Sequence, residues 1–284
     1  MKWPLKQNNR SRVLGGSGCD EESRSRVLSA SIKLGMYYRP DRESRLSRNA
    51  DALLLTSLAT VRVSAVPLPI NSLINIKTNH QTMNKEIFEQ MYERAGAVWT
   101  RTEPPEELVE LIESEKISPC KTIDIGCGEG FYSIYLASRG FDVLGIDLSE
   151  NAIQYAEENA LRHGVNVRFV TMDIADLKQL NEKFDFVLEW ALMHQIMPPQ
   201  RPKYVKDVAE LLNKGGKYLS ICFNEQSLMF GSPGKKYRES PSGTTLYYTS
   251  QNELRELFEP HFHIFEAKII RKPHIDNYFF MEKL

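Results

Sequence analysis

A segment rich in glycine, Asp124–Gly130, carries the first pattern in this sequence that could do chemistry. Its glycines, Gly126, Gly128 and Gly130, stand at alternate positions in a D-x-G-x-G-x-G spacing. Glycine at such positions lets the backbone turn tightly and approach a ligand that a Cβ atom would block. A helix beginning directly afterwards would point free N–H groups at the turn, which suits a carboxylate. The segment therefore predicts a binding turn for a ligand with an anionic end.

The spacing of these glycines separates two classes of nucleotide-containing cofactor. A turn for a nicotinamide dinucleotide has the spacing G-x-G-x-x-G, and its third glycine would fall where this chain has Phe131. The observed spacing instead resembles the signature of class I S-adenosylmethionine-dependent methyltransferases; the alternative is an ordinary strand-to-helix turn. The resemblance implies S-adenosyl-L-methionine as the cofactor, held by five residues of the turn: Asp124, Gly126, Cys127, Gly128 and Gly130.

Two further carboxylates follow the turn. Asp147 ends an apolar run 21 residues beyond Gly126, a spacing at which a carboxylate can accept hydrogen bonds from both ribose hydroxyls. Leu148 would then offer an apolar face to the adenine. Asp173 ends the next apolar run and could meet the adenine amino group, with Ile174 against the ring. Either aspartate could instead cap the N-terminus of the segment that follows it.

The methyl acceptor is expected at the end of the apolar run Phe184–Trp190. A sulfonium cofactor already carries an activated methyl group, so the protein must mainly align an acceptor with it. Glu189, Trp190 and His194 are the groups that could face the acceptor, and Glu189 could also contact the cofactor. His194 could take a proton near neutral pH or could only shape its loop. Trp190 suits a pocket wall.

Two stretches resemble the thiopurine, thiol and halide methyltransferase group. The first, Trp99–Pro105, is similar to the segment before the sheet in that group, where a Trp and a Pro precede a helix that closes over the cofactor. The second leads from Trp190 through Pro199 to Arg201 and Tyr204. The resemblance implies a small soft nucleophile such as a thiol as acceptor, with Arg201 and Tyr204 lining its pocket. On a helix both residues could equally be solvated or structural.

A long polar segment, Asn224–Thr249, contains a basic run that ends at Arg238. Loops of this length in compact domains commonly have a function. This segment could be a lid in which Arg238 recognises an anionic acceptor and tyrosines exclude water. A mobile surface insertion is the alternative.

The elements that must position these residues alternate regularly between strand and helix. Such alternation predicts a parallel sheet covered on both faces. We therefore expect residues 83–284 to form an α/β, Rossmann-like domain with a seven-stranded, mostly parallel sheet and helices on both faces. The expected strands are Lys121–Ile125, Asp142–Ile146, Val167–Met172, Phe184–Trp190, Lys217–Phe223, Phe262–Ile270 and Asn277–Glu282. The expected helices are Lys85–Ala95, one from Pro104 to Ser114, Phe131–Arg139, Ala152–His163, Arg201–Leu212 and Ser250–Phe258.

Composition excludes several other classes of protein. No stretch approaches the roughly 18–20 apolar residues of a membrane span. Four widely spaced cysteines without a C-x-x-C pair argue against a disulfide framework or a metal site, and they favour a reduced, cytoplasmic protein. Residues 1–80 carry 13 Lys and Arg against 6 Asp and Glu, whereas the remainder carries 23 against 31. An acidic main domain argues against nucleic acid as a partner.

Residues 1–82 are rich in Ser and Arg and lack hydrophobic periodicity. They predict a disordered tail or an extension that is not native, because regular patterning begins only at Met83. The sequence as a whole predicts an enzyme, an S-adenosylmethionine-dependent methyltransferase with a small-molecule acceptor. A protein or tRNA methyltransferase and a non-catalytic cofactor-binding scaffold are the alternatives. Nothing in the sequence indicates an oligomeric state.

Overall fold

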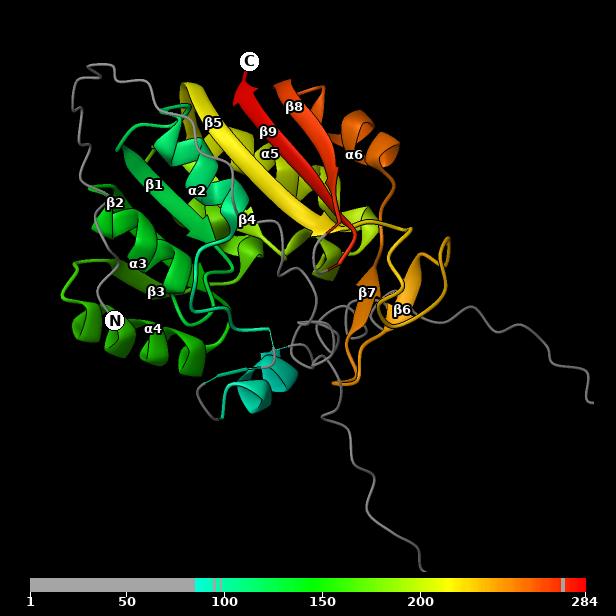
Figure 1. The fold of residues 1–284 in the computed structure, drawn as a ribbon, viewed down its shortest axis with the longest axis horizontal. Coiled ribbons are helices and arrows are strands. Elements are labelled where there is room, and N and C mark those ends of the chain that lie inside the picture. Colours follow the sequence, from blue (N-terminus) through cyan, green and yellow to red (C-terminus); the bar gives the residue numbers. More distant parts are fainter. Residues whose placement is uncertain (1–84, 94–95, 98, 272–273) are drawn as a thin grey trace, which may run out of the picture. The chain divides into compact units, whose positions relative to one another are not determined.

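The computed structural model describes residues 85–284 apart from 94–95, 98 and 272–273. The segment 1–82, expected to be a tail or extension, lies outside these residues. The described residues form a seven-stranded sheet in the order β3-β2-β1-β4-β5-β9-β8 (Figure 1). The first five of these strands are parallel, while β9 and β8 run antiparallel to their neighbours. The strands are β1 (Lys121–Ile125), β2 (Asp142–Asp147), β3 (Arg168–Thr171), β4 (Phe184–Trp190), β5 (Leu212–Phe223), β8 (Phe262–Ile270) and β9 (Asp276–Lys283).

Helices cover both faces of this sheet, which confirms the expected α/β architecture. The α-helices are residues 85–91, α2 (Glu106–Glu113), α3 (Phe131–Ser138), α4 (Glu150–His163), α5 (Arg201–Leu211) and α6 (Gln251–Phe258). Alternate side chains of a strand point to opposite faces, and β1 shows the consequence directly. Ile123 and Ile125 join the core cluster that contains Val205 and Val208 of α5, whereas Asp124 accepts a hydrogen bond from Ser133 of α3.

The strand order places the glycine-rich segment at a switch point of the sheet. The chain passes from β1 to β2 on one side, and β4 then pairs with the other edge of β1. Open α/β sheets bind ligands outside the carboxyl ends of their strands where the order reverses in this way. The segment 126–130 leaves β1 at that end, so the fold puts the expected binding turn in the position that such ligands use.

Two segments differ from the elements expected at them. The sequence Asn213–Gly216 was expected to separate α5 from a strand, but β5 begins already at Leu212. This early part of β5 is irregular, because the register against β4 shifts between Phe184 and Phe186 and Gly215 has a φ of 75°. The segment Asn224–Thr249, expected to be a lid or a mobile loop, contains a hairpin of β6 (Tyr237–Glu239) and β7 (Thr245–Tyr247).

Candidate cofactor and acceptor site

The glycines of the turn have backbone conformations that explain their residue type. Gly126, Gly128 and Gly130 have φ values of 76°, 54° and 78°, a region that residues with a Cβ atom rarely adopt. A Cβ atom on Gly130 would lie 2.7 Å from Phe169 and 2.8 Å from Ala156. Packing at the start of α3 therefore requires glycine at position 130. A Cβ atom on Gly128 would instead meet Tyr92.

That group is Tyr92, which the sequence did not single out. A Cβ atom on Gly128 would lie 2.9 Å from the Tyr92 hydroxyl, and the hydroxyl accepts a hydrogen bond from Trp99 Nε1 at 2.7 Å. Tyr92 is 3% exposed. Burial, and secondarily the charge of Asp147, raise the pKa of its hydroxyl. No motif in the sequence marks Tyr92; its one signal there is an aromatic ring seven residues before Trp99.

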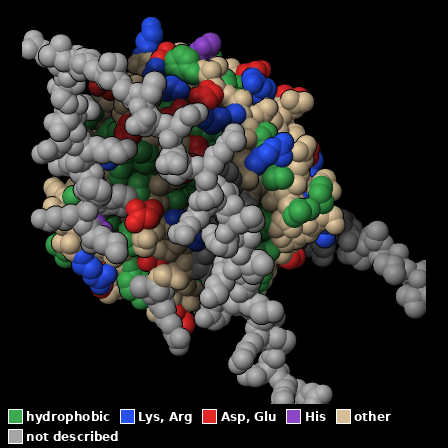
Figure 2. All heavy atoms as spheres, viewed as in Figure 1, with side chains coloured by type: hydrophobic (Ala, Val, Ile, Leu, Met, Phe, Trp, Pro, Cys, Tyr) green, Lys and Arg blue, Asp and Glu red, His purple; other side chains and the backbone are tan. Residues whose placement is uncertain are grey.

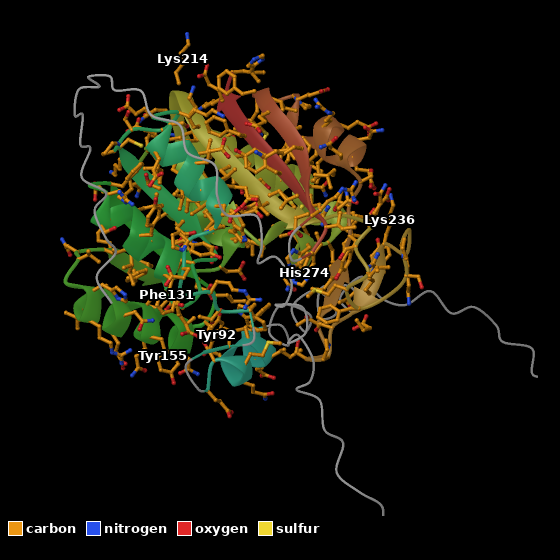
Figure 3. The ribbon with its side chains drawn as sticks, in the orientation of Figure 1. Tyr92, Phe131, Tyr155, Lys214, Lys236 and His274 are labelled. Carbon is orange, nitrogen blue, oxygen red and sulfur yellow. The ribbon has the colours of Figure 1, made fainter. Side chains whose placement is uncertain are left out.

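Two carboxylates hold the segment that carries Tyr92 against the turn. Glu89 Oε1 and Oε2 accept hydrogen bonds from the backbone N–H groups of Glu150 and Asn151 at the start of α4. In the other direction, Glu129 Oε1 accepts from the N–H groups of Gly96 and Ala97 at 2.8 and 3.1 Å. We call residues 85–100, as far as they are described, the N-terminal strap. Tyr92 is labelled in Figure 3, close to the label of Phe131.

Asp147 lies where a ribose-binding carboxylate was expected. Its Oδ2 accepts a hydrogen bond from Gly128 N at 2.9 Å and its Oδ1 from Ser149 N at 3.0 Å. The carboxylate thus braces the turn, and each oxygen keeps a further lone pair for a ligand hydroxyl. The alternative of Asp147 as a helix cap is wrong, since Ser149 is the N-cap of α4. Leu148 is half-buried beside it.

Asp124 is a buried component of the turn and Cys127 a half-buried one. The Asp124 carboxylate accepts a hydrogen bond from Ser133 Oγ at 2.6 Å, and burial raises its pKa to about 7. Burial also raises the pKa of the Cys127 thiol, whose sulfur lies 3.7 Å from the carbonyl oxygen of Gly128. These contacts give both residues a part in shaping the turn; direct contact with the cofactor stays a prediction for them.

Asp173 occupies the position that the capping alternative describes. It is the N-cap of the short 3₁₀ helix η1 (Ile174–Gln179), and its Oδ1 accepts a hydrogen bond from Ala175 N at 2.9 Å. Among the described residues, no hydrogen bond is formed by the other carboxylate oxygen of Asp173. Ile174 is partly buried and packs against the main core. The adenine contacts of Asp173 and Ile174 therefore stay a prediction.

Glu189 does not face the turn. It pairs in register with Ile125, so its side chain points to the α5 face of the sheet, opposite to Asp124. There it is fully buried and accepts hydrogen bonds from Met193 N at 2.8 Å, from Tyr218 Oη at 2.7 Å and from Ser220 Oγ at 2.9 Å. The expected contact with cofactor or acceptor is corrected by this geometry: Glu189 shapes the chain after β4.

His194 is buried rather than poised to exchange a proton near neutral pH. Its ring stacks on Phe223 with centroids 4.0 Å apart and an angle of 16° between the planes. Burial, and then the nearby Arg201 charge, lower its pKa to about 3. The ring is therefore neutral at physiological pH and a poor base. The expectation that His194 takes a proton from the acceptor is thus contradicted, although its Nδ1 has no hydrogen-bond partner among the described residues.

Arg201 and Tyr204 serve the core and not an acceptor pocket. The Arg201 guanidinium donates hydrogen bonds to the carbonyl oxygens of Ile196 and Met193 and to Thr249 Oγ1, at 2.7, 2.8 and 2.5 Å. Tyr204 is 4% exposed and belongs to the main core cluster. The acceptor contacts expected of both residues are replaced by structural ones, because α5 turns this face towards the sheet.

Arg238 is likewise enclosed, in the segment that follows β5. It is 1% exposed, and its guanidinium donates to four backbone carbonyls, at distances from 2.7 to 2.9 Å. The carbonyls belong to Glu225, Ser227, Met229 and Lys235. Recognition of an anionic acceptor by Arg238 is therefore corrected: its donors are used to hold the segment together.

The role of Trp190 as a pocket wall stays a prediction. It ends β4, is half-buried, and makes an edge-to-face contact with Tyr132 of α3, with ring centroids 5.7 Å apart. Tyr132 follows the turn by two residues and so links the expected acceptor wall to the cofactor turn.

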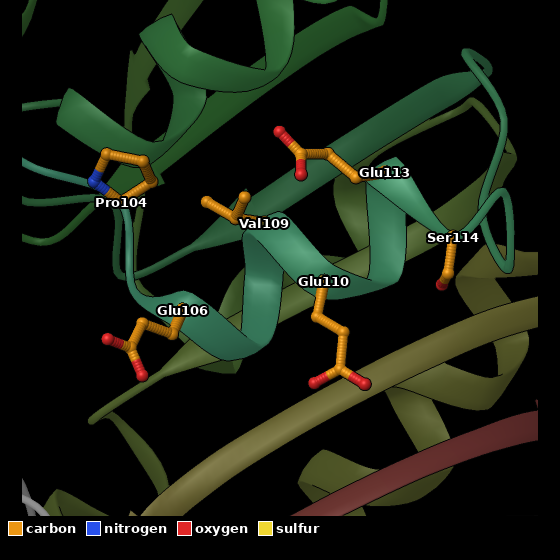
Figure 4. Close-up of a pocket in the computed structure, with 6 residues that line it drawn as sticks. All are labelled: Pro104, Glu106, Val109, Glu110, Glu113 and Ser114. Carbon is orange, nitrogen blue, oxygen red and sulfur yellow. The ribbon is translucent and has the colours of Figure 1, made fainter. Parts of the chain in front are cut away.

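A separate hollow lies along α2. It has a volume of about 550 Å³ and is lined by Pro104, Val109, Ser114 and three glutamates (Figure 4). None of the expected site residues contributes to this lining. On the face in Figure 2, acidic and basic side chains of the described residues are interspersed. Among the described residues, no helix is long and apolar enough to span a membrane.

Comparison with known proteins agrees with this geometry. Residues 123–216 match the family model described as a methyltransferase domain. A 2-heptyl-1-hydroxyquinolin-4(1H)-one methyltransferase of Mycobacteroides abscessus is 28% identical over 149 residues, which are 50% of this chain and 65% of that protein. A ubiquinone biosynthesis O-methyltransferase of Coxiella burnetii is 32% identical over 129 residues, 44% of this chain and 54% of that protein. The chain thus spans between half and two thirds of these relatives.

A solved structure shares the fold. The 1,6-didemethyltoxoflavin N1-methyltransferase of Burkholderia thailandensis has a TM-score of 0.59 at 20% identity, over 78% of this chain and 93% of that one. The matched domain is thus that of a methyltransferase, and the shared fold is the one found in class I S-adenosylmethionine-dependent methyltransferases. The residues present fit that cofactor: Asp147 offers lone pairs to the ribose hydroxyls, and the absence of a Cβ atom on Gly128 leaves a cradle beside Tyr92.

Proposed function

We propose that this chain transfers the methyl group of S-adenosylmethionine to a small-molecule acceptor. The observation that carries the proposal is the bracing of Gly128 by Asp147 at the switch point of the sheet. It joins the glycine-rich turn to a carboxylate with lone pairs to spare, which is what a ribose needs. When bound, the cofactor supplies an activated methyl group, and the protein's task is to align the acceptor and exclude water.

The identity of the acceptor is supported less directly. The relatives are named for a hydroxyquinolone and for ubiquinone biosynthesis, and these names support a small organic acceptor over a protein or a tRNA. The acceptor expected from the thiol-group resemblance, a soft nucleophile, stays a prediction. A cytoplasmic location also stays a prediction from the spacing of the cysteines.

The experiment is a calorimetric titration with S-adenosylmethionine of the full chain and of Asp147→Ala. Loss of the carboxylate removes the acceptor for two hydroxyls and the brace on Gly128, so we expect binding to weaken at least tenfold. The control is Asp142→Asn at the exposed start of β2, which should bind as the unaltered chain does. Undiminished binding by Asp147→Ala would contradict the site. Incubation with methyl-labelled cofactor and a panel of thiols, phenols, heteroaromatics and amines then tests transfer itself, and a failure to label any product favours a non-catalytic scaffold.

A further inference from the structure

The ends of β4, β5 and β9 bring one more carboxylate to the acceptor side of the sheet. Trp190 pairs with Ile221 of β5, and Phe223, two residues further along β5, pairs with Asp276 at the start of β9. Because the side-chain period of a strand is two, Trp190, Phe223 and Asp276 lie on one face. It is also the face of Asp124, since Asp124 pairs with Leu188, two residues before Trp190.

Aromatic rings form the surroundings of this carboxylate. Phe223 lies between His194 and Tyr248, with centroid distances of 4.0 and 5.1 Å and nearly parallel planes. His274 meets the Phe223 ring edge-on at 5.9 Å, and it is labelled in Figure 3 close to where β9 begins. Trp190 and Tyr132 add a second edge-to-face pair. The stack encloses Phe223 between two rings, so this wall is aromatic. His194 Nδ1 and the Tyr248 hydroxyl are also buried without a hydrogen-bond partner among the described residues.

Asp276 is the polar group set into that wall. Its Oδ1 is buried and has no hydrogen-bond partner among the described residues. A buried carboxylate oxygen without a donor costs stability and is uncommon unless a ligand supplies the donor. Burial, and secondarily the charge of Glu107, raise the pKa of Asp276 to about 7. The charge of Asp276 also acts on Tyr248 and on Cys222, whose side chain lies on the opposite face of β5.

The buried arginines near this wall already bind other groups of the protein and are not free to bind an anionic acceptor. The guanidinium groups of Arg201 and Arg238 donate their hydrogen bonds to backbone carbonyls and, for Arg201, also to Thr249. The charge of Arg101 acts on His274 and Tyr132, and the charge of Glu107 opposes it at Tyr132 and acts on Asp276 as well. An acceptor bearing its own carboxylate would meet this repulsion, whereas a neutral ring with an N–H or O–H group would satisfy Asp276.

We propose that Asp276 is the specificity-determining residue of the acceptor pocket and accepts a hydrogen bond from an N–H or O–H group of a neutral, planar heteroaromatic acceptor. Neighbouring strands lie about 4.8 Å apart, so β9 is about 10 Å from β4. A fused two-ring acceptor can bridge that span between Trp190 and Asp276. The inference rests on the proposed function, because it names the acceptor class of the same site.

The test is calorimetric binding of three probes to the full chain saturated with S-adenosylhomocysteine. The probes are 4-hydroxyquinoline, 4-methoxyquinoline, which lacks the donor, and quinoline-4-carboxylate, which adds a charge. We expect 4-hydroxyquinoline to bind about tenfold more tightly than 4-methoxyquinoline and the carboxylate to bind most weakly. Asp276→Leu should abolish the preference for 4-hydroxyquinoline, while Asp276→Asn, which keeps an acceptor oxygen, should retain part of it.

The matched control is Asp142→Asn, an exposed aspartate at the start of another strand, which should leave all three affinities unchanged. Thermal melting and binding of S-adenosylhomocysteine show that each Asp276 variant is folded. If S-adenosylhomocysteine binds but no probe does, or if Asp276→Leu retains the full preference, the acceptor inference is overturned and the proposed function stands. If S-adenosylhomocysteine itself does not bind the unaltered chain, the proposed function fails, and the inference with it.

Discussion

Arg238 shows how a single buried cation can organise a segment of irregular backbone. Its guanidinium donates to four carbonyls between Glu225 and Lys235, and it stacks over the ring of Tyr248 at 3.7 Å from the centroid. Planar guanidinium groups suit such fixed, multiple acceptors better than the point charge of a lysine. Arg238 therefore stabilises the backbone of this segment, whereas an exposed arginine could bind an anionic ligand.

We expect Arg238→Lys to lower the free energy of unfolding by about 2 kcal/mol, because several buried carbonyls lose their donors. Urea denaturation measures this loss. The control is Lys235→Arg at an exposed neighbouring position, which should leave stability within error. Binding of S-adenosylmethionine well below the unfolding transition should be unchanged. A variant that is fully stable but has lost turnover of its acceptor would instead support the lid function expected from the sequence.

At the scale of elements, the N-terminal strap is the part of the fold that completes the cofactor turn. It precedes β1 in the chain, yet Glu129, from within the turn, binds its backbone at Gly96 and Ala97, and Thr100 Oγ1 donates to the same carboxylate oxygen at 2.8 Å. The strap thereby brings Tyr92 to Gly128. The position of Tyr92 depends on contacts made more than thirty residues away in sequence.

Glu129→Gln should loosen the strap, since a neutral amide oxygen is a weaker acceptor for three donors than a carboxylate. We expect faster amide hydrogen exchange at Gly96 and Ala97 and a cofactor affinity several-fold lower, with the sheet unaffected. Hydrogen exchange followed by mass spectrometry, with calorimetry alongside, measures both effects. Glu86→Gln, at an exposed position of the first described helix, is the control. Unchanged exchange in Glu129→Gln would show that Glu89 alone holds the strap.

Most elements of the sheet were predictable because their apolar runs are bounded by glycine, proline or acidic residues. The bounds of β1, β4 and β8 match the expected ranges. The hairpin of β6 and β7 was not predictable, since its strands have three residues each and show too little alternation to stand out from a polar loop. The start of β5 was missed because Gly215 and Gly216 usually end an element, whereas here they accommodate a register shift.

The candidate site was predictable where backbone conformation dictates residue type, and less so where burial decides the role. The glycines and Asp147 follow from the turn at the switch point. The roles of Glu189 and His194 depend on which face of the sheet and which ring they meet, and one sequence does not reveal this. Asp276 was missed because its partner strand is antiparallel and distant in the chain.

At the scale of the whole molecule, two buried carboxyl groups of the described residues make stability depend on pH. Burial raises the pKa of Asp124 and of Asp276 to about 7, from an ordinary value of 3.8. A raised pKa means that the folded chain holds a proton that the unfolded chain has released, so this contribution is complete below pH 3.8 and is lost as pH rises through 7. Glu182 and Glu253, with pKa values of about 2, act oppositely below pH 4.5. His194, whose pKa is lowered from 6.5 to about 3, also acts oppositely, up to pH 6.5, and offsets part of the loss from the two aspartates.

The melting temperature should therefore fall between pH 5 and pH 8 and level off above the pKa of these groups. In Asp276→Asn the melting temperature should fall less, because the loss in free energy of unfolding at pH 8 is smaller by roughly 1 kcal/mol after allowance for partial exposure. Asp142→Asn should follow the unaltered chain at every pH. Scanning calorimetry over this range makes the measurement, and a melting temperature that rises from pH 5 to pH 8 would contradict the assignment.

The two carboxylate oxygens of Glu89 have a consequence for the selection of nucleotides. They occupy the first N–H groups of α4, the helix that follows Asp147, and helix N-termini are the ordinary docking place of phosphate groups. A phosphorylated nucleotide brought to this end of the helix would meet a fixed negative charge where it needs free donors. The Glu89 carboxylate thus takes the place of a bound anion at this helix N-terminus. Binding of the sulfonium cofactor does not require these N–H groups, because the cofactor carries no phosphate.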